Sequence, residues 1–394
     1  QQDIATLEAG LKDGTLTTDQ VDRAITPLLE LMIKKRDAKS EKIVCNYDDN
    51  FNVAIKIGEE SAVLLKNEEN VLPLRNNTKV ALIGNFAKKP RYQGSGSSKI
   101  NPHKLVSVYD SFVANNVDFV YSDGYREHDI EANETLINEA VKVAKEAEVV
   151  VICAGLPESY EVEGYDRPTI DMPPSHNALI AAISRVHKRV VVVLSIGSPV
   201  LMPWVNDVQT ILLAHLLGGA TGPVTYNLLF GHANPSGKLS ETYPLNLEDR
   251  VPGLDFLKPE SNVLYRESLY IGYRYYDTYK KQVLFPFGHG LSYTQFHTKV
   301  NDLVIKDDGF EISITVANIG HLAGSEVVGI YIGRSFSKLY GPKKELKAFT
   351  KVFLAPGEKQ DITLFVSRDS LRVYHPLLNK WVLENTFYNV YVGI

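Results

Sequence analysis

One short segment of the sequence gathers side chains that could transfer protons. Residues 158–167 read Glu-Ser-Tyr-Glu-Val-Glu-Gly-Tyr-Asp-Arg and hold four acids and one arginine. A carboxyl group whose neighbours raise its pKa can act as a general acid, and a pair between Asp166 and Arg167 can hold the shape of a loop. The same composition is typical of a solvated acidic loop. Composition alone therefore leaves both interpretations open.

A second segment is rich in glycine and serine. Residues 94–98 read Gly-Ser-Gly-Ser-Ser, and such small residues let a backbone come close to a ligand. A phosphate cradle is one reading, but no Lys-Ser or Lys-Thr pair follows in register, and the spacing is not that of a dinucleotide-binding loop. A plain tight turn is a further alternative.

The acidic segment directly follows an expected buried strand. Helical patterns at residues 136–147 and 177–184 alternate with short apolar runs, several of them apolar throughout, which predicts a layered α/β domain with a mostly parallel sheet. The expected strands are Lys79–Gly84, Val117–Tyr121, Glu148–Ala154, Arg189–Ile196 and Thr210–His215. Ligands of such sheets bind beyond the carboxyl ends of the strands, and the acidic segment leaves the strand Glu148–Ala154 at that end.

The two ends of the chain have other patterns. Thr17 and Gln20 form a capping box before a helical pattern in which Pro27 predicts a kink or a delayed start, and residues 38–42 read as a connector. After residue 295 the alternation has period two, as in Phe310–Val316, and predicts a β-sandwich of the immunoglobulin or fibronectin type III style. The expected division is 1–41 for a helical segment and linker, 42–248 for the α/β domain, 249–294 for an irregular, tyrosine-rich inter-domain strap, and 295–394 for the sandwich.

The order of several segments resembles glycoside hydrolase family 3, the β-glucosidase and β-xylosidase family. The run Glu-Gly-Tyr-Asp-Arg at 163–167, after a strand and before Asp-Met-Pro, is similar to the family's acid/base loop, and 94–98 to its glycine-serine loop. The resemblance continues at 58–67 with 71–74, at 231–239, at 270–277, at 285–293 and at 344–349, and so covers nearly the whole chain.

The resemblance implies a retaining, exo-acting β-glycosidase that works with two carboxyl groups and needs no metal or organic cofactor. Glu163 matches the acid/base and is expected to have a raised pKa, with Glu161 as its nearest rival. Ser97 and Ser98 match residues that contact the sugar, and Asp166 with Arg167 is interpreted as a structural bridge. The implied substrate is a β-glucoside or oligosaccharide, with a β-xyloside as the alternative.

The family's other carboxylate, the nucleophile, belongs to a (β/α)8 barrel. Residues 1–41 resemble only the last helices of that barrel, and no segment like the family's nucleophile motif precedes them. The chain alone is therefore expected to be inactive, and a barrel domain or a separate barrel chain is the expected partner. The alternatives are a non-catalytic carbohydrate-binding protein and a scaffold protein derived from the same family.

The overall composition excludes several classes of protein. Lys and Arg total 42 against 47 acids, a net charge of −5, which gives no basic surface for nucleic acid. No apolar run reaches the roughly 20 residues of a membrane-spanning helix. The two cysteines, Cys45 and Cys153, lie in no zinc-binding spacing. Oligomeric state and compartment stay open.

Overall fold

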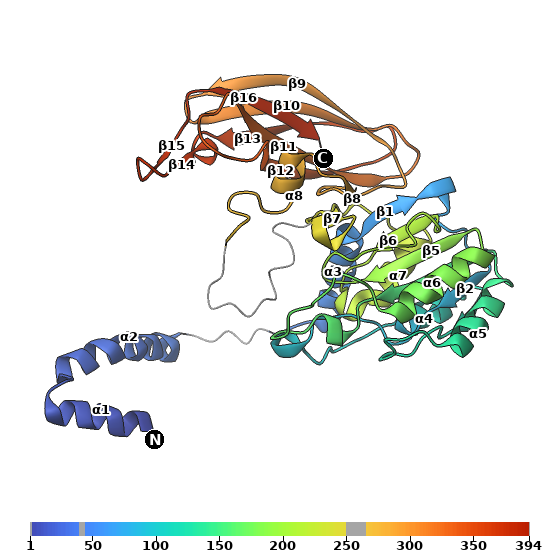
Figure 1. Ribbon diagram of the computed structural model, residues 1–394, viewed down its shortest axis with the longest axis horizontal. Coiled ribbons are helices and arrows are strands. Elements are labelled where there is room, and N and C mark those ends of the chain that lie inside the picture. The colour runs from blue at the N-terminus through green and yellow to red at the C-terminus, as the bar shows by residue number, and fades with distance from the viewer. Residues whose placement is uncertain (1, 39–43, 250–264, 394) are drawn as a thin grey trace. The chain divides into compact units, whose positions relative to one another are not determined.

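The computed structural model describes residues 2–38, 44–249 and 265–393. The chain divides into a first unit that ends at Tyr47 and a second unit from Asp48 onward. The first unit contains α1 (Gln2–Asp13) and α2 (Thr18–Asp37) (Figure 1).

The predicted capping box opens α2. The Thr17 N–H donates to the Gln20 side chain at 2.8 Å, and the Gln20 N–H donates to the Thr17 hydroxyl at 3.3 Å. Because the helix starts directly after Thr17, Pro27 lies inside it, and the expectation of a delayed start was wrong. No described side chain of α2 is buried. The expected connector at 38–42 lies mostly outside the described residues.

A six-stranded sheet forms the centre of the α/β domain, in the order β1-β6-β5-β4-β2-β3. Its strands are β1 (Val63–Asn67), β2 (Val80–Ile83), β3 (Phe119–Ser122), β4 (Val149–Gly155), β5 (Val190–Ser195) and β6 (Thr210–Leu213). All pairings are parallel except that of β1 with β6, which is antiparallel, so the prediction of a layered, mostly parallel domain is confirmed. Every residue of β4 and β5 is buried, as expected for strands covered on both faces.

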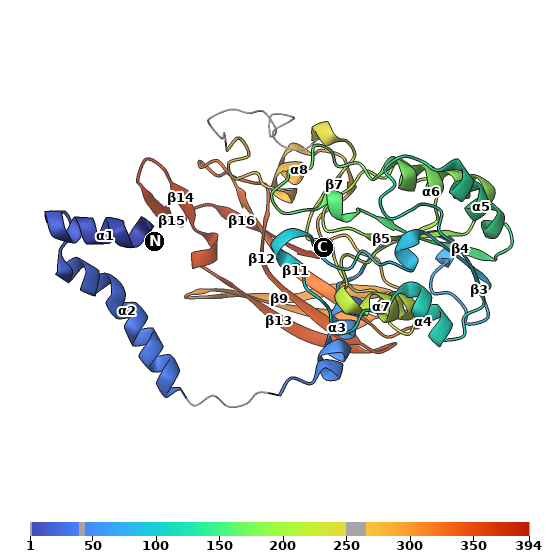
Figure 2. The ribbon, with the colours of Figure 1, turned by 90° about the horizontal axis from the view of Figure 1, so that it is seen from below.

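Helices cover both faces of this sheet. They are α3 (Tyr47–Ser61), α4 (Val108–Ala114), α5 (Glu134–Ala144), α6 (Pro174–Val186) and α7 (Thr221–Leu229). Figure 2 shows α5 with α6 on one side of the strands and α4 with α7 on the other. The helix expected from residue 177 starts earlier, at Pro174, because proline fits the first turn, where its missing N–H has no partner to lose.

The expected strap is partly regular. Residues 250–264 lie outside the described residues, but α8 (Tyr273–Tyr279) and β8 (Val283–Phe285) follow, and β8 pairs with β7 (Tyr243–Pro244). The prediction that this stretch is irregular was therefore wrong for these two elements. Tyr270, Tyr273 and Tyr276 are buried, which agrees with a packed segment.

The predicted β-sandwich follows and is confirmed. One sheet has the order β13-β10-β9 and the other β12-β11-β16. Its strands are β9 (Phe296–Lys306), β10 (Gly309–Asn318), β11 (Gly324–Ser335), β12 (Glu345–Leu354), β13 (Lys359–Ser367) and β16 (Phe387–Gly393), with a small hairpin of β14 (Val373–His375) and β15 (Lys380–Val382). Alternating residues such as Ile312, Ile314 and Val316 build its core. Among the described residues, no helix is long and apolar enough to cross a membrane.

Candidate active site

The acidic loop begins where β4 ends. There the Gly155 N–H donates to Nδ1 of His176, on α6, at 3.2 Å. His176 is almost fully buried, and this burial lowers its pKa to about 3, because the charged imidazolium would lose its hydration. A neutral ring can accept a hydrogen bond at Nδ1, so uncharged His176 holds the base of the loop.

The acidic loop and the glycine-serine loop meet, as the predicted site requires. Ser95 and Val162 form a parallel bridge between the two loops. The Ser97 N–H donates to Oε2 of Glu163 at 3.0 Å across 66 positions of sequence, and the Ser97 hydroxyl donates to the same oxygen. Gly96 has a φ of +87°, and a Cβ there would lie 2.8 Å from the Cβ of Glu163. Only glycine lets the backbone come this close to Glu163 without displacing it.

The prediction of a raised pKa for Glu163 was wrong for the chain as described. Its pKa is lowered, first by the hydrogen bond from the Ser97 hydroxyl and second by that from the Ser97 N–H. Both bonds stabilise the ionised carboxylate, and because the side chain is exposed, desolvation opposes them only as the smallest of the three causes. The second oxygen of Glu163 accepts no hydrogen bond within the described part of the chain.

The carboxylate of Glu161, the rival candidate, accepts hydrogen bonds from within the protein on both oxygens. Its two oxygens accept from the Gly197 N–H at 3.0 and 3.1 Å, and one of them also accepts from the Ser198 hydroxyl at 2.7 Å. Gly197 and Ser198 follow β5, the neighbour of β4 in the sheet. Glu161 therefore ties the acidic loop to the next strand end, whereas Glu163 keeps one oxygen available.

Arg91 contacts the same loops, and the sequence analysis did not identify it as a site residue. Its side chain is 4% exposed. It donates from Nε to the Leu156 carbonyl at 3.1 Å, from Nη2 to the Glu161 carbonyl at 3.3 Å, and from Nη1 to the Gln93 carbonyl. One buried guanidinium thus connects the end of β4, the acidic loop and the start of the glycine-serine loop. No sequence signal separates it from the nearby Lys88 and Lys89.

The expected bridge between Asp166 and Arg167 is not formed among the described residues. Arg167 instead donates from Nη2 to the Pro199 carbonyl at 2.9 Å, and its buried Nη1 has no partner in the described structure. A further ion pair joins the two loops, since the Nζ of Lys99 lies 3.0 Å from an oxygen of Glu158.

Ser98 lies beside this contact without joining it. Its hydroxyl donates to the Ser95 carbonyl at 3.5 Å, so it contacts its own loop. Within the described ranges, no cluster of His, Cys, Asp and Glu has the arrangement of a metal site. What the geometry offers is one exposed carboxylate, held on one oxygen and open on the other, which is suited to proton transfer with a bound ligand.

The comparisons with known proteins agree with this architecture. Residues 62–293 match the glycosyl hydrolase family 3 C-terminal domain, and residues 326–394 match a fibronectin type III-like domain. The chain therefore belongs to glycosyl hydrolase family 3.

Within that family several relatives cover almost the whole chain. It is 41% identical to the thermostable β-glucosidase B of Acetivibrio thermocellus over 97% of its length and 52% of that protein. It is 36% identical, over 97% of its length and 52% of the relative, to an exo-α-(1→6)-L-arabinopyranosidase of Bifidobacterium breve. The crystal structure of a Bifidobacterium adolescentis family 3 β-glucosidase superposes with a TM-score of 0.92 at 38% identity, over 99% of this chain and 58% of that one. The chain thus spans about half the length of the curated relatives it matches.

Proposed function

We infer that this chain supplies the acid/base half of a retaining, exo-acting β-glycosidase of the β-glucosidase type. Glu163 is the proposed acid/base, and the proposed nucleophile is an aspartate of a (β/α)8 barrel that is not among these 394 residues. The observation that supports this most is the hydrogen bond from Ser97 to one oxygen of Glu163. It joins two loops that are distant in sequence, at the carboxyl end of a parallel sheet.

Glu163 has two tasks in this reaction. While the nucleophile attacks the anomeric carbon, the protonated Glu163 gives its proton to the departing glycosidic oxygen. The ionised Glu163 then takes a proton from the water that releases the sugar, which regenerates the acid. Ser97 keeps the carboxylate in position, and Ser98 is proposed as a hydroxyl contact to the sugar.

The first task needs a proton that the carboxyl does not hold in this chain at neutral pH, since its pKa is lowered. Contact with a barrel would remove water from the exposed side of Glu163 and raise its pKa, because burial disfavours the charged form. The proposed partner therefore contributes the environment of the acid as well as the nucleophile.

The proposed substrate class is a terminal β-linked sugar, with a β-glucoside favoured because two of the similar proteins reported above are called β-glucosidases. A β-xyloside remains the alternative. The relative from Bifidobacterium breve is named for an arabinopyranoside. Proteins that are similar in sequence over these 394 residues can therefore carry names for different sugars.

Complementation tests the proposal. The 394-residue chain is assayed with an aryl β-glucoside, alone and with the separately produced barrel domain of the Acetivibrio thermocellus relative. We expect turnover only from the mixture. With a disaccharide, whose leaving group is poor, the mixture made with Glu163→Gln should be slower by about a hundred- to ten-thousand-fold, and the loss on the aryl glucoside should be smaller. Robust turnover by the chain alone would contradict the proposed division of labour. A barrel that binds the chain without any gain in activity would favour the scaffold alternative.

A further inference from the structure

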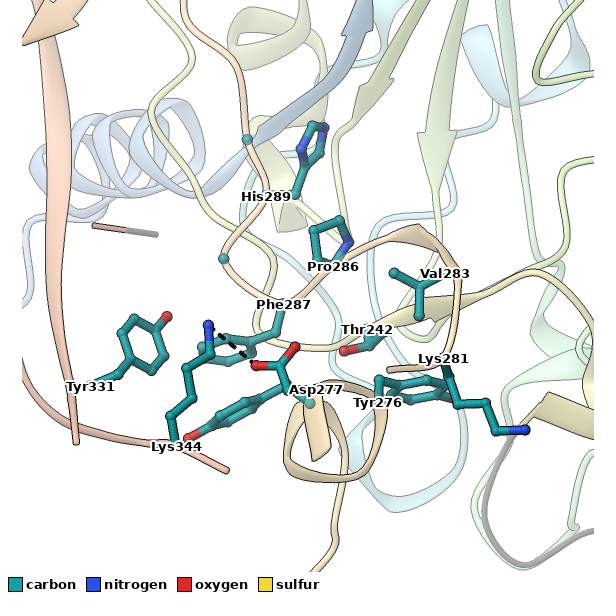
Figure 3. A pocket seen from close by; sticks show the side chains of 13 residues that line it. Thr242, Tyr276, Asp277, Lys281, Val283, Pro286, Phe287, His289, Tyr331 and Lys344 are labelled. Carbon is teal, nitrogen blue, oxygen red and sulfur yellow. Dashed lines mark ion pairs between the residues drawn. The ribbon is translucent and has the colours of Figure 1, made fainter. Parts of the chain in front are cut away.

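Arg91 is a buried charge whose hydrogen-bond partners, within the described structure, are all uncharged backbone carbonyls. At the pocket shown in Figure 3, by contrast, the Nζ of Lys344 lies 3.2 Å from Asp277, so each charge there is balanced by the other. Burial lowers the pKa of Arg91, because the charged guanidinium loses hydration. A protein can retain such an unfavourable buried group because it fixes one conformation of the chain.

The guanidinium joins the two loops immediately before their parallel bridge. Nη1 donates to the Gln93 carbonyl, and Nη2 donates to the Glu161 carbonyl at 3.3 Å. The bridge between Ser95 and Val162 comes two residues after the first carbonyl and one residue after the second. Arg91 therefore holds the two loops at the point from which they run on side by side.

The hydrogen bond between Ser97 and Glu163 comes next along both loops, and it lies nearer the surface. Arg91 is 4% exposed, Ser95 and Val162 are half-buried, and Ser97 and Glu163 are exposed. Water competes for both partners of an exposed hydrogen bond, whereas the bonds of a buried guanidinium are charge-assisted and shielded from water. The position of Glu163 should therefore depend on the buried end of this series of contacts.

We propose that Arg91 is the positioning residue of Glu163: its guanidinium holds the two loops together at their buried end, and so keeps the carboxylate where Ser97 can donate to it. Arg91 acts through the loops and has no contact with substrate in this role. A lysine would keep the charge, but it lacks the planar fork that reaches several carbonyls at once. The catalytic consequence rests on the proposed function, whereas the effect on the Glu163 carboxylate does not.

Arg91→Lys in the 394-residue chain tests this role, with a titration of the Glu163 carboxyl followed by carbon NMR. We expect the contact with Ser97 to loosen, so the Glu163 pKa should rise towards the ordinary value for glutamate, and the Ser97 amide signal should shift. In the enzyme completed with its barrel, the same variant should lower kcat on a disaccharide about a hundredfold, with a smaller change in KM.

Arg334→Lys is the matched control. Arg334 is also a buried arginine, with a side chain that is 10% exposed, but it donates to Ser337 and Glu384 in the sandwich region. Both variants should lower the melting temperature, and only Arg91→Lys should move the Glu163 pKa. If Arg334→Lys moved that pKa as far, a general loss of stability would explain the result and the proposal would be wrong.

Hydrogen exchange in the wild-type chain tests the same claim even where Arg91→Lys does not fold. If the contact of Ser97 depends on Arg91, the Ser97 amide cannot stay closed while the guanidinium is open, so its protection factor should not exceed that of the Arg91 Nε–H. Higher protection at Ser97 would overturn the proposal, as would a Glu163 pKa that Arg91→Lys leaves unmoved. A raised Glu163 pKa without loss of activity in the completed enzyme would support the positioning by Arg91 and contradict the proposed role of Glu163 as the acid.

Discussion

Two regions of this protein join distant segments through polar side chains, yet they differ in burial. At the loop pair, Ser97 holds Glu163 and Lys99 holds Glu158, and the Lys99 and Glu158 side chains are 55% and 47% exposed. At the seam between the α/β domain and the sandwich, the Nζ of Lys238 lies 3.0 Å from Glu326, and these side chains are 12% and 14% exposed.

Several further hydrogen bonds stabilise this seam. The Lys238 Nζ also donates to the Gly290 carbonyl at 2.8 Å. Asn234 donates to the Ala323 carbonyl at 3.0 Å and accepts at 2.9 Å from the Ser292 hydroxyl. Asn234 and Lys238 lie in segment 231–239, and Gly290 and Ser292 lie in segment 285–293. Both segments resemble the family, as the acidic loop does. The comparison teaches that the family resemblance alone does not separate residues that hold the structure from the proposed acid/base. What distinguishes Glu163 is an oxygen that accepts no hydrogen bond in the described structure.

The largest effect on stability is expected at the seam. Lys238→Met removes the ion-pair partner of Glu326, whose side chain is only 14% exposed, and breaking a buried pair typically costs about 3 to 5 kcal/mol. Lys99→Met is the matched control at the loop pair, where an exposed ion pair contributes at most about 1 kcal/mol. Urea unfolding of both variants measures the two values. Equal losses would remove the distinction between the regions.

Acid is expected to weaken the base of the acidic loop. The pKa of His176 is about 3 in the fold against 6.5 for an ordinary histidine, so the unfolded chain takes up a proton first as the pH falls. The contribution of neutral His176 is complete above pH 6.5 and declines towards pH 3, by about 1.4 kcal/mol per pH unit.

Urea unfolding at pH 7 and pH 4.5 measures this contribution, with His176→Gln as the comparison. The glutamine variant cannot be protonated, so its stability should fall less over that interval. If the wild type and the variant lose stability in parallel, His176 is not the group responsible.

A smaller and more local effect is expected at Gly96. Gly96→Ala brings both a strained positive φ, about 1 to 2 kcal/mol, and a methyl group 2.8 Å from the Cβ of Glu163. Gly164 has a φ of +90° with open space around it, so Gly164→Ala supplies the strain without the clash. Gly96→Ala should therefore lose more stability than Gly164→Ala, and only Gly96→Ala should break the contact between Ser97 and Glu163. Chemical shifts of the Ser97 amide in both variants decide this.

The smallest expected effect comes from removing a single hydroxyl group. Ser97→Ala removes the main cause of the lowered pKa of Glu163, so that pKa should move up towards the ordinary value for glutamate. Ser98→Ala removes a neighbouring hydroxyl that contacts the Ser95 carbonyl, and should leave the Glu163 pKa in place. Carboxyl carbon NMR over a pH titration reports both. A Glu163 pKa that Ser97→Ala leaves unmoved would show that the contact does not control it.

Patterns within one element could be predicted from the sequence. The capping box at Thr17 and Gln20 and the buried strand β4 follow from local spacing and apolar runs, and both are present. The short antiparallel edge strand β1 was not predicted, because its five residues directly follow α3 and carry no signal of their own. The family resemblance assigned both loops to one sugar site, but it did not predict that Ser97 would donate to Glu163.

Contacts between elements could not be predicted in the same way. The direction of the Glu163 pKa shift depends on Ser97, 66 positions away, and the pairing of Arg167 depends on how the guanidinium turns in the fold. The role of Arg91 depends on three carbonyls that converge only after the sheet has formed. A sequence pattern fixes residue types at such sites, but not which partner lies nearest.

The leaving-group dependence of Glu163→Gln and Glu161→Gln, measured in an enzyme completed with its barrel, tests the central claim most directly. If Glu163 donates the proton, Glu163→Gln should slow glycosides with poor leaving groups far more than activated aryl glycosides, which need little protonation. Glu161→Gln disturbs the anchor at Gly197 and Ser198, and should slow both classes alike. Equal losses on both classes for Glu163→Gln, or the selective loss for Glu161→Gln, would contradict the account.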